Sequence, residues 1–443
     1  MATVTTLAGE SFVPELPERL LQIACDIRKA NGRAFLVGGW VRDALLGKNC
    51  RDYDVEVYDI GQDELIPILK RYGKTNLVGK AFGVIHLAMK GESLDFSFPR
   101  TESKVGYGHR GFVVHTDEKL SFKEAALRRD FTINAMGMEL PDLTLCDPYG
   151  GIDDLKKNVL RHVGPAFVED SLRILRGVQF ASRFALTLAP ETIELCRTLS
   201  LEDLSIERLF EEFKKWLLKP GVPSMGLKAF LDIGLDSFFP EIAPYAGSWD
   251  ILGALLDNMA KIRSSVLQKN AEALSEDECS ELAFAALLAG NAIACIDANG
   301  VKSVAEKFLA RITNEIHLVK KVPEILSCYG SLDFETVPAA PEMRRFAVRL
   351  GGMKLLCLLV QSTPASMFKN PDFADKFTIA AQELSVYGEA PQPFLTGKML
   401  MDLGVKPGKQ MGVLIKQSFE LQLDGELTNE TEALAWAQKS LTP

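Results

Sequence analysis

Two neighbouring stretches of the chain decide its fold: LVGGWVRDALLG at residues 36–47 and RDYDVEVY at residues 51–58. The first predicts a strand that passes through a glycine turn into a helix. The second predicts a strand with Asp52 and Asp54 two positions apart, which places both side chains on one face. Each piece alone is typical of an ordinary turn or of solvated acids. Paired carboxylates beside a turn open to phosphates are what metal-assisted nucleotidyl transfer requires, so the combination favours catalysis.

Further residues near these stretches complete the candidate site. Gly38 and Gly39 allow the backbone to approach phosphates closely, and the start of the following helix favours negative charge. Arg42 is a candidate to grip a triphosphate. A third carboxylate is expected on a neighbouring strand: Asp95 is the candidate, and Glu56, on the same face as Asp54, is the competitor.

The composition bounds the class of protein. A chain of 443 residues with 47% hydrophobic and 25% charged residues is expected to form about two to four globular domains. No apolar run reaches the roughly 20 residues that span a bilayer, which predicts no membrane association. Its eight cysteines include no C-x-x-C pair, which argues against zinc and disulfides and favours the cytoplasm. A net charge of −9 excludes a generally basic RNA-coating protein but allows a local basic surface.

The periodicity of the chain changes near residue 153. Before it, a helix is expected at 17–31, strands at 34–38, 53–58, 83–89 and 94–98, and a mobile, glycine-containing loop at 100–124. This pattern favours a small mixed sheet. After it, helical periodicity dominates, with helices expected at 171–184, 190–199, 206–218, 225–233, 251–262, 279–288, 303–312, 342–350 and 354–360.

Two further segments carry candidate binding residues. In LRRDFTINA at 127–135, Arg128 and Arg129 could contact phosphates or ribose, with Asp130 and Asn134 orienting them; the alternative is a salt-bridged edge of a strand or helix.

The second segment is VEDSLRILR at 168–176. On a helix, Asp170, Arg173 and Arg176 share a face. Asp170 could accept from the exocyclic amine of cytosine or adenine while Arg173 donates to ring acceptors; a surface charge ladder is the alternative. Uracil and guanine would set a carbonyl against the carboxylate, which costs on the order of 1–3 kcal/mol per unpaired group.

With these residues, the chain resembles the class II tRNA nucleotidyltransferase (CCA-adding) and bacterial poly(A) polymerase family of the polymerase-β-like superfamily. The matching segments follow the family order over residues 34–215: Gly38-Gly39-x-x-Arg42-Asp43, Asp52-x-Asp54, Arg128–Ala135, Asp147–Leu155 with Leu160–His162, Glu169-Asp170-x-x-Arg173-x-x-Arg176, and Glu207–Glu212.

The resemblance implies an α+β fold: a polymerase-β-like nucleotidyltransferase head with a small mixed sheet, followed by an all-α neck, body and tail. We expect a catalytic head at 1–152, a nucleotide-selecting neck at 153–240, and a tRNA-binding body and tail at 241–443. It further implies Mg2+ as cofactor, CTP and ATP as substrates, and the 3′ end of tRNA as acceptor. The oligomeric state stays open.

The residues carried over by the resemblance fall into two groups. Asp52, Asp54 and Asp95 are the expected catalytic residues, and Asp52 and Asp54 the expected metal ligands. The expected nucleotide-binding residues are Gly38, Gly39, Arg42, Asp43, Arg128, Arg129, Asp130, Asn134, Asp170, Arg173 and Arg176.

Departures from the family pattern narrow the activity. No His-Asp pair occurs in the chain, so residues 241–443 are expected to hold a degenerate HD-like region without phosphohydrolase activity. The segment 100–123 is full-length for the family, which favours complete CCA addition or terminal A addition. Poly(A) polymerases of this family tend to have basic tails and a basic pair before a phenylalanine. This chain has Lys80-Ala81 before Phe82 and is acidic, so poly(A) synthesis ranks second. A catalytically silent tRNA-binding protein and a small-molecule nucleotidyltransferase are the alternatives from other classes.

Overall fold

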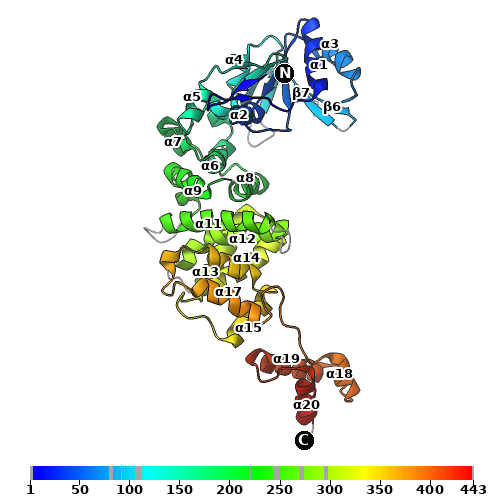
Figure 1. Ribbon diagram of the computed structural model, residues 1–443, viewed down its shortest axis with the longest axis vertical. Helices are drawn as coiled ribbons and strands as arrows, with labels where there is room; N and C mark the ends of the chain where they lie inside the picture. The colour runs from blue at the N-terminus through cyan, green and yellow to red at the C-terminus, as the bar shows by residue number, and fades with distance from the viewer. Residues whose placement is uncertain are drawn as a thin grey trace. The chain divides into compact units, whose positions relative to one another are not determined.

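A seven-stranded mixed sheet organises the N-terminal part of the computed structural model (Figure 1). Its strand order is β11-β10-β3-β4-β7-β6-β5; β4 and β7 are parallel, and the other neighbours are antiparallel. The strands are β3 (Arg33–Val37), β4 (Asp54–Tyr58), β5 (Lys74–Val78), β6 (Val84–Met89), β7 (Glu92–Ser97), β10 (Gly137–Leu140) and β11 (Thr144–Cys146). The four expected strands are therefore confirmed as β3, β4, β6 and β7, while β5, β10 and β11 were not predicted.

The structure describes residues 3–78, 83–90, 92–104, 112–219, 221–242, 249–268, 274–293 and 298–441. The chain divides into a first unit, residues 1–216 with 225–234, and a second unit, residues 217–224 with 235–443. No helix within the described ranges combines the length and the apolar character needed to cross a membrane.

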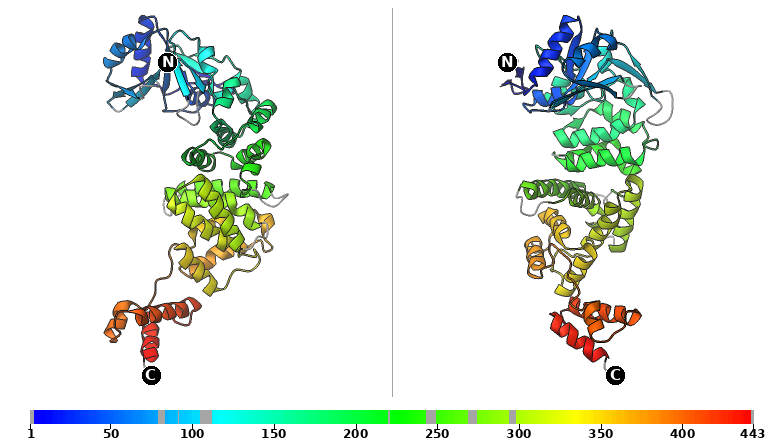
Figure 2. Two further views of the ribbon diagram at one scale, coloured as in Figure 1. Left: turned by 180° about the vertical axis from the view of Figure 1, so that it is seen from behind. Right: turned by 90° about the vertical axis from the view of Figure 1, so that its right-hand side faces the viewer.

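Helices cover the sheet because their apolar stripes match its buried strands. α1 (Glu18–Lys29) packs against β3 and α3 (Gln62–Lys70). Figure 1 shows α1 beside α3, and Figure 2 shows these blue helices against the sheet from two further sides. α1 buries Leu20, Ile23, Ala24 and Ile27, whose spacing follows one helical face. β3 is buried along four of its five residues, so the sheet is apolar on both sides there. The short α2 (Gly39–Leu45) leads directly from β3 towards β4.

The segment expected to be a mobile loop contains regular structure instead. β8 (Arg100–Lys104) and β9 (Phe112–Thr116) pair antiparallel, and α4 (Phe122–Ala126) follows. α4 begins with a capping box between Ser121 and Glu124. The loop prediction was therefore wrong at both ends, because paired strands satisfy the backbone there. The expected glycines 106, 108 and 111 lie outside the described residues, as do Lys80 and Ala81.

Helices build the rest of the first unit. They are α5 (Gly151–Lys156), α6 (Leu172–Phe184), α7 (Pro190–Arg197), α8 (Ile206–Leu218, ending in the second unit) and α9 (Pro223–Ile233). Short elements connect them and the sheet: the strands β1 (Val4–Thr5), β2 (Ser11–Phe12), β12 (Val159–Leu160) and β13 (Thr187–Leu188), and the 3-10 turns η2 (Thr132–Asn134) and η3 (Pro165–Glu169).

The described part of the second unit is helical, as its periodicity predicted. Its helices are α10 (Leu235–Phe238), α11 (Trp249–Gln268), α12 (Glu276–Ile293), α13 (Ala298–Ile312), α14 (Ile316–Tyr329), α15 (Ala340–Leu350), α16 (Lys354–Ser362), α17 (Phe373–Glu383), α18 (Gly397–Asp402), α19 (Lys409–Asp424) and α20 (Glu430–Leu441), with a 3-10 turn η4 (Ala365–Met367). Helices α10, α14, α17 and α18 were not predicted. α14 contains Pro323, a residue that ordinarily interrupts helical patterns.

Candidate active site

The glycine turn after β3 lies next to a carboxylate and an arginine. Gly38 has φ +72°, a conformation that side chains disfavour. A Cβ atom there would lie 3.4 Å from Arg129 Nη1 and 4.0 Å from Asp54 Oδ2. Because Gly38 has no side chain, the backbone of this turn lies next to one positively and one negatively charged side chain.

Two of the expected carboxylates lie side by side on neighbouring strands of the sheet. Asp54 is the first residue of β4 and is directly opposite Asp95 in the parallel pair with β7. Burial by the cleft walls raises the pKa of Asp54, although its side chain remains open to solvent, and the charges of Asp52 and Asp95 raise it further. The placement of Asp52 on the strand was wrong, because Asp52 lies in the extended segment before β4. The charges of Asp52 and Asp95 nevertheless both act on Asp54.

These carboxylates offer oxygen donors of the kind that bind hard cations. Within the described ranges, no three His, Cys, Asp or Glu side chains converge closely enough to hold a metal ion by themselves. Asp95 Oδ1 lies 2.7 Å from His86 Nδ1 on β6, a contact that the sequence did not predict. The repulsion that raises the pKa of Asp54 is relieved by any cation placed between Asp54 and Asp52, so the donor set fits a divalent ion.

Glu56, the competitor for the third carboxylate, binds neighbouring protein side chains instead. Its side chain is 1% exposed and accepts hydrogen bonds from Tyr58 Oη at 2.7 Å and Arg128 Nη2 at 2.6 Å. Burial alone would raise the pKa of Glu56, but Arg129 and Arg128 outweigh it, and the pKa is lowered. Glu56 thus anchors two arginines, and the geometry favours Asp95 as the third carboxylate.

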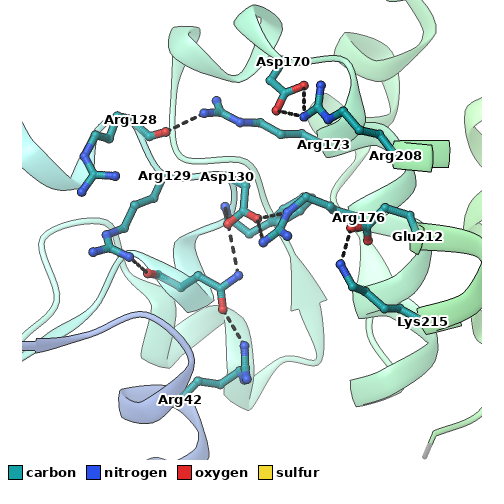
Figure 3. Close-up of polar contacts among 12 residues, drawn as sticks. Arg42, Arg128, Arg129, Asp130, Asp170, Arg173, Arg176, Arg208, Glu212 and Lys215 are labelled. Carbon is teal, nitrogen blue, oxygen red and sulfur yellow. Dashed lines mark hydrogen bonds and ion pairs between the residues drawn. The ribbon is translucent and has the colours of Figure 1, made fainter. Parts of the chain in front are cut away.

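A chain of hydrogen bonds links α2, the 127–135 segment and α6 (Figure 3). Arg42 Nη1 donates to Asn134 Oδ1 at 2.6 Å, and Asn134 Nδ2 donates to Asp130 Oδ1 at 3.1 Å. Arg176 then donates to Asp130 Oδ2 through Nε at 2.8 Å and Nη2 at 2.7 Å. Arg42 also pairs with Asp43 and lies 4.1 Å over the ring of Phe184. Asp130 and Asn134 thus each fix an arginine through their side chains, but these are Arg176 and Arg42, so the expectation that they orient Arg128 and Arg129 was wrong.

The 168–176 segment differs from its prediction. Asp170 ends the η3 turn and precedes α6, so the placement of Asp170 on one helix with Arg173 and Arg176 was wrong. Arg173 donates to the carbonyls of Ala166 at 2.6 Å and Arg128 at 2.7 Å. The donor beside Asp170 is Arg208 of α8, as Figure 3 shows.

A cavity of about 530 Å³ joins these groups within the first unit. It has the volume of a small-molecule site. Eight arginines and three aspartates line it, so its walls attract anions. The lining residues are Gly38, Gly39, Arg42, Asp54, Arg100, Arg128, Arg129, Asp130, Asn134, Asp170, Leu172, Arg173, Arg176, Phe180, Arg183 and Arg208.

Most of the expected residues meet at this cavity, and three do not line it: Asp43, Asp52 and Asp95. Sequence reasoning assigned no role to Arg183 or Arg208. Arg183 lies seven positions after Arg176 on α6 and so repeats its helical face, which was an available signal. Arg208 is part of a segment that carried the family resemblance, but only the folded chain shows that it meets Asp170.

Comparisons with known proteins agree with this geometry. Residues 34–161 match the family model described as the poly A polymerase head domain. Residues 34–161 are therefore similar to the head domain of that family. The resemblance inferred from the sequence is thereby confirmed, together with the mixed-sheet head and helical remainder.

A curated relative and two solved structures extend the comparison. The chain is 42% identical over 218 residues to the multifunctional CCA protein of Xanthomonas campestris pv. campestris (strain B100), covering 47% of this chain and 51% of the relative. The chain thus matches about half the length of this curated relative. A Bacillus stearothermophilus CCA-adding enzyme in complex with CTP has a similar fold (TM-score 0.65, 23% identity, 95% and 96% coverage of the two chains). So does a Thermotoga maritima CCA-adding enzyme complexed with tRNA (TM-score 0.60, 22% identity, 96% of each).

Proposed function

We propose that this chain is a nucleotidyltransferase that adds C, C and A to the 3′ end of tRNA, without a template, from CTP and ATP. The single observation that carries the proposal is that Asp54 lies opposite Asp95 on neighbouring strands, next to the Gly38 turn, and that Asp54 and Gly38 line a cavity together with eight arginines. The relatives named for CCA addition support the same reaction.

Mg2+ is the proposed cofactor, with Asp52 and Asp54 as its ligands. A bound divalent ion supplies charge neutralisation at the phosphates and lowers the pKa of an attacking hydroxyl. Asp95, across from Asp54, is placed to orient the tRNA 3′-hydroxyl or to take its proton. Gly38 and Gly39 allow the triphosphate to approach the backbone at this point.

The arginines are the proposed phosphate and ribose ligands. Arg42 and Arg176 are held by Asn134 and Asp130, and Arg128 is held by Glu56. A guanidinium fixed by a buried acceptor loses little side-chain entropy on binding an anion, so a cavity built this way is preorganised for a triphosphate. Arg129 and Asp43 belong to the same network.

Base selection is the proposed role of Asp170, with Arg173 holding the surrounding backbone. The Asp170 carboxylate lines the cavity and can accept from the amino group of cytosine or adenine. We further propose a head at 1–152, a neck at 153–240 and a tRNA-binding body and tail at 241–443. We also propose a cytoplasmic location, which the scattered cysteines without a C-x-x-C pair favour.

The test is incorporation of each labelled nucleotide into tRNA that lacks its terminus, with Mg2+ present. The proposal expects two C residues followed by one A. Addition of A alone to tRNA ending in CC would identify an A-adding enzyme, and long A tails on unrelated RNA would identify a poly(A) polymerase. Absence of any incorporation would contradict the proposal and leave a tRNA-binding role.

A further inference from the structure

Asp170 is held by an arginine from a different helix. Arg208 Nη2 donates to both carboxylate oxygens of Asp170, at 3.0 Å to Oδ1 and 2.8 Å to Oδ2 (Figure 3). The backbone N–H of Leu172 donates to Oδ1 at 3.1 Å. The two charged side chains are each about a quarter exposed, 23% for Asp170 and 24% for Arg208, and both line the cavity. The ion pair is therefore part of the cavity wall.

Arg173 makes two hydrogen bonds to backbone carbonyls near this carboxylate. It is 9% exposed, and two of its nitrogens donate to the backbone carbonyls of Ala166 and Arg128. These contacts tie the start of α6 to the segment after α4. Arg208 and the Leu172 N–H donate directly to the Asp170 carboxylate and so orient it.

The hydrogen bonds that Asp170 accepts leave one of its carboxylate oxygens able to accept another. A carboxylate oxygen has two lone pairs. Among contacts in the described part of the chain, Oδ1 accepts two hydrogen bonds and Oδ2 accepts one. Oδ2 therefore keeps one acceptor position. A fixed acceptor at the wall pairs with an amino group and leaves a carbonyl oxygen unpaired.

α8 is a rigid support for Arg208. Its following residues Leu209, Phe213 and Trp216 are buried, at 6%, 1% and 1% exposure. Ser182 of α6 donates to the carbonyl of Trp216 at 3.3 Å, which joins the two helices that carry the site. A guanidinium on such a helix holds its partner in one geometry better than a group on a loop would.

We infer that Arg208 is a specificity-determining residue, which fixes Asp170 so that the site accepts cytosine and adenine and rejects uracil and guanine. This inference rests on the proposed function. Without Arg208, Asp170 can rotate away from the base, and the carbonyl of uracil or guanine no longer meets a fixed acceptor. Replacing Arg208 is therefore expected to change the selectivity between bases, in addition to any loss of affinity that is the same for all four nucleotides.

The experiment compares kcat/KM for CTP with UTP, and for ATP with GTP, in the full chain with Mg2+ and tRNA substrates. R208Q is expected to lower both ratios roughly 10-fold or more, as the loss of one charge-assisted contact would. R208K, which retains the charge but has no planar fork, is expected to retain selectivity only in part. Wild-type ratios in R208Q, or in R208K if R208Q does not fold, would overturn the inference.

R183Q is the matched control. Arg183 lines the same cavity but has its guanidinium over the Phe184 ring, 5.0 Å from the centroid, rather than on Asp170. Its removal takes away the same charge and is expected to raise the KM of all four nucleotides with unchanged ratios. A fall in the ratios of R183Q equal to that of R208Q would assign selectivity to the overall charge and overturn the inference. If the wild-type chain incorporates no nucleotide, the proposed function fails; if it is selective and R208Q is equally selective, only the role of Arg208 fails.

Discussion

The basic residues of the two units differ in how they are held. In the first unit, cavity arginines are fixed by buried acceptors: Asp130 holds Arg176, and Glu56 holds Arg128. In the second unit, Lys302 and Arg349 share Glu324 in a groove on α13 to α15. The groove also contains Lys320, Lys321 and Glu306, so its positive charge is diluted by two carboxylates. An arginine that is held by a buried carboxylate is preorganised to bind an anionic ligand. A carboxylate that two exposed cations share is typical of a solvated helix surface.

The largest effect of any substitution is expected on the rate of nucleotide incorporation, at Asp54 of the first unit. D54A should reduce nucleotide incorporation by roughly 10³-fold, because the site loses a metal-binding carboxylate worth several kcal/mol. D54N is the more conservative variant. Because the raised pKa of Asp54 means that its ionised form is disfavoured in the folded protein, D54N should not lower the melting temperature. Incorporation by D54A at the wild-type rate would remove Asp54 from the reaction.

The buried anchors should also dominate stability. D130A leaves Arg176 beside a cavity without its main partner and should lower the free energy of unfolding by roughly 3–5 kcal/mol. E324Q, which breaks the exposed pairs of the second unit, should cost less than about 1 kcal/mol. Urea unfolding measures both. Equal costs for the two variants would show that burial does not distinguish the two kinds of anchor.

The same anchors predict how stability depends on pH. Burial would raise the pKa of Asp130, but Arg176 and the hydrogen bonds of Asn134 outweigh it and lower the pKa, as for Glu56. A lowered pKa adds stability that is present above the unfolded value of about 4 and is lost as pH falls through the folded value. Thermal melting between about pH 6 and pH 3 should show the loss, and D130N should weaken it. A D130N curve parallel to that of the wild type would contradict this assignment.

The smallest effect is expected in the second unit. K320Q removes one exposed cation from the groove on α13 to α15 and should change the KM for tRNA by less than about 3-fold, since a single phosphate contact at physiological salt is worth little. The KM for CTP should not change. Steady-state kinetics with each substrate varied in turn checks both. A 10-fold rise in the KM for tRNA would show that this groove, despite its carboxylates, binds RNA.

The sequence predicted the parts of this molecule that depend on local order. The run from β3 through the glycine turn to β4 could be inferred because alternation and glycine conformation act over a few residues. The 100–124 segment was wrongly predicted to be a mobile loop, because its glycines and charged residues are typical of loops and give no sign that β8 pairs with β9. α14 was missed because Pro323 interrupts its pattern.

Contacts between distant residues were beyond local reasoning. Asp170 and Arg208 are 38 positions apart on different elements, and His86 meets Asp95 only because β6 pairs with β7. The sequence therefore supplied most of the candidate site residues, but it did not predict the contact of Arg208 with Asp170. Spacing on one helix cannot reveal a donor that another helix supplies.

A crystal structure of the chain with CTP and Mg2+ tests the central claim most directly. The account predicts a metal ion on Asp52 and Asp54, a triphosphate against Gly38 and Gly39, and the cytosine amino group at Asp170 Oδ2. Nucleotide bound in another part of the chain, with these carboxylates free of metal, would contradict it.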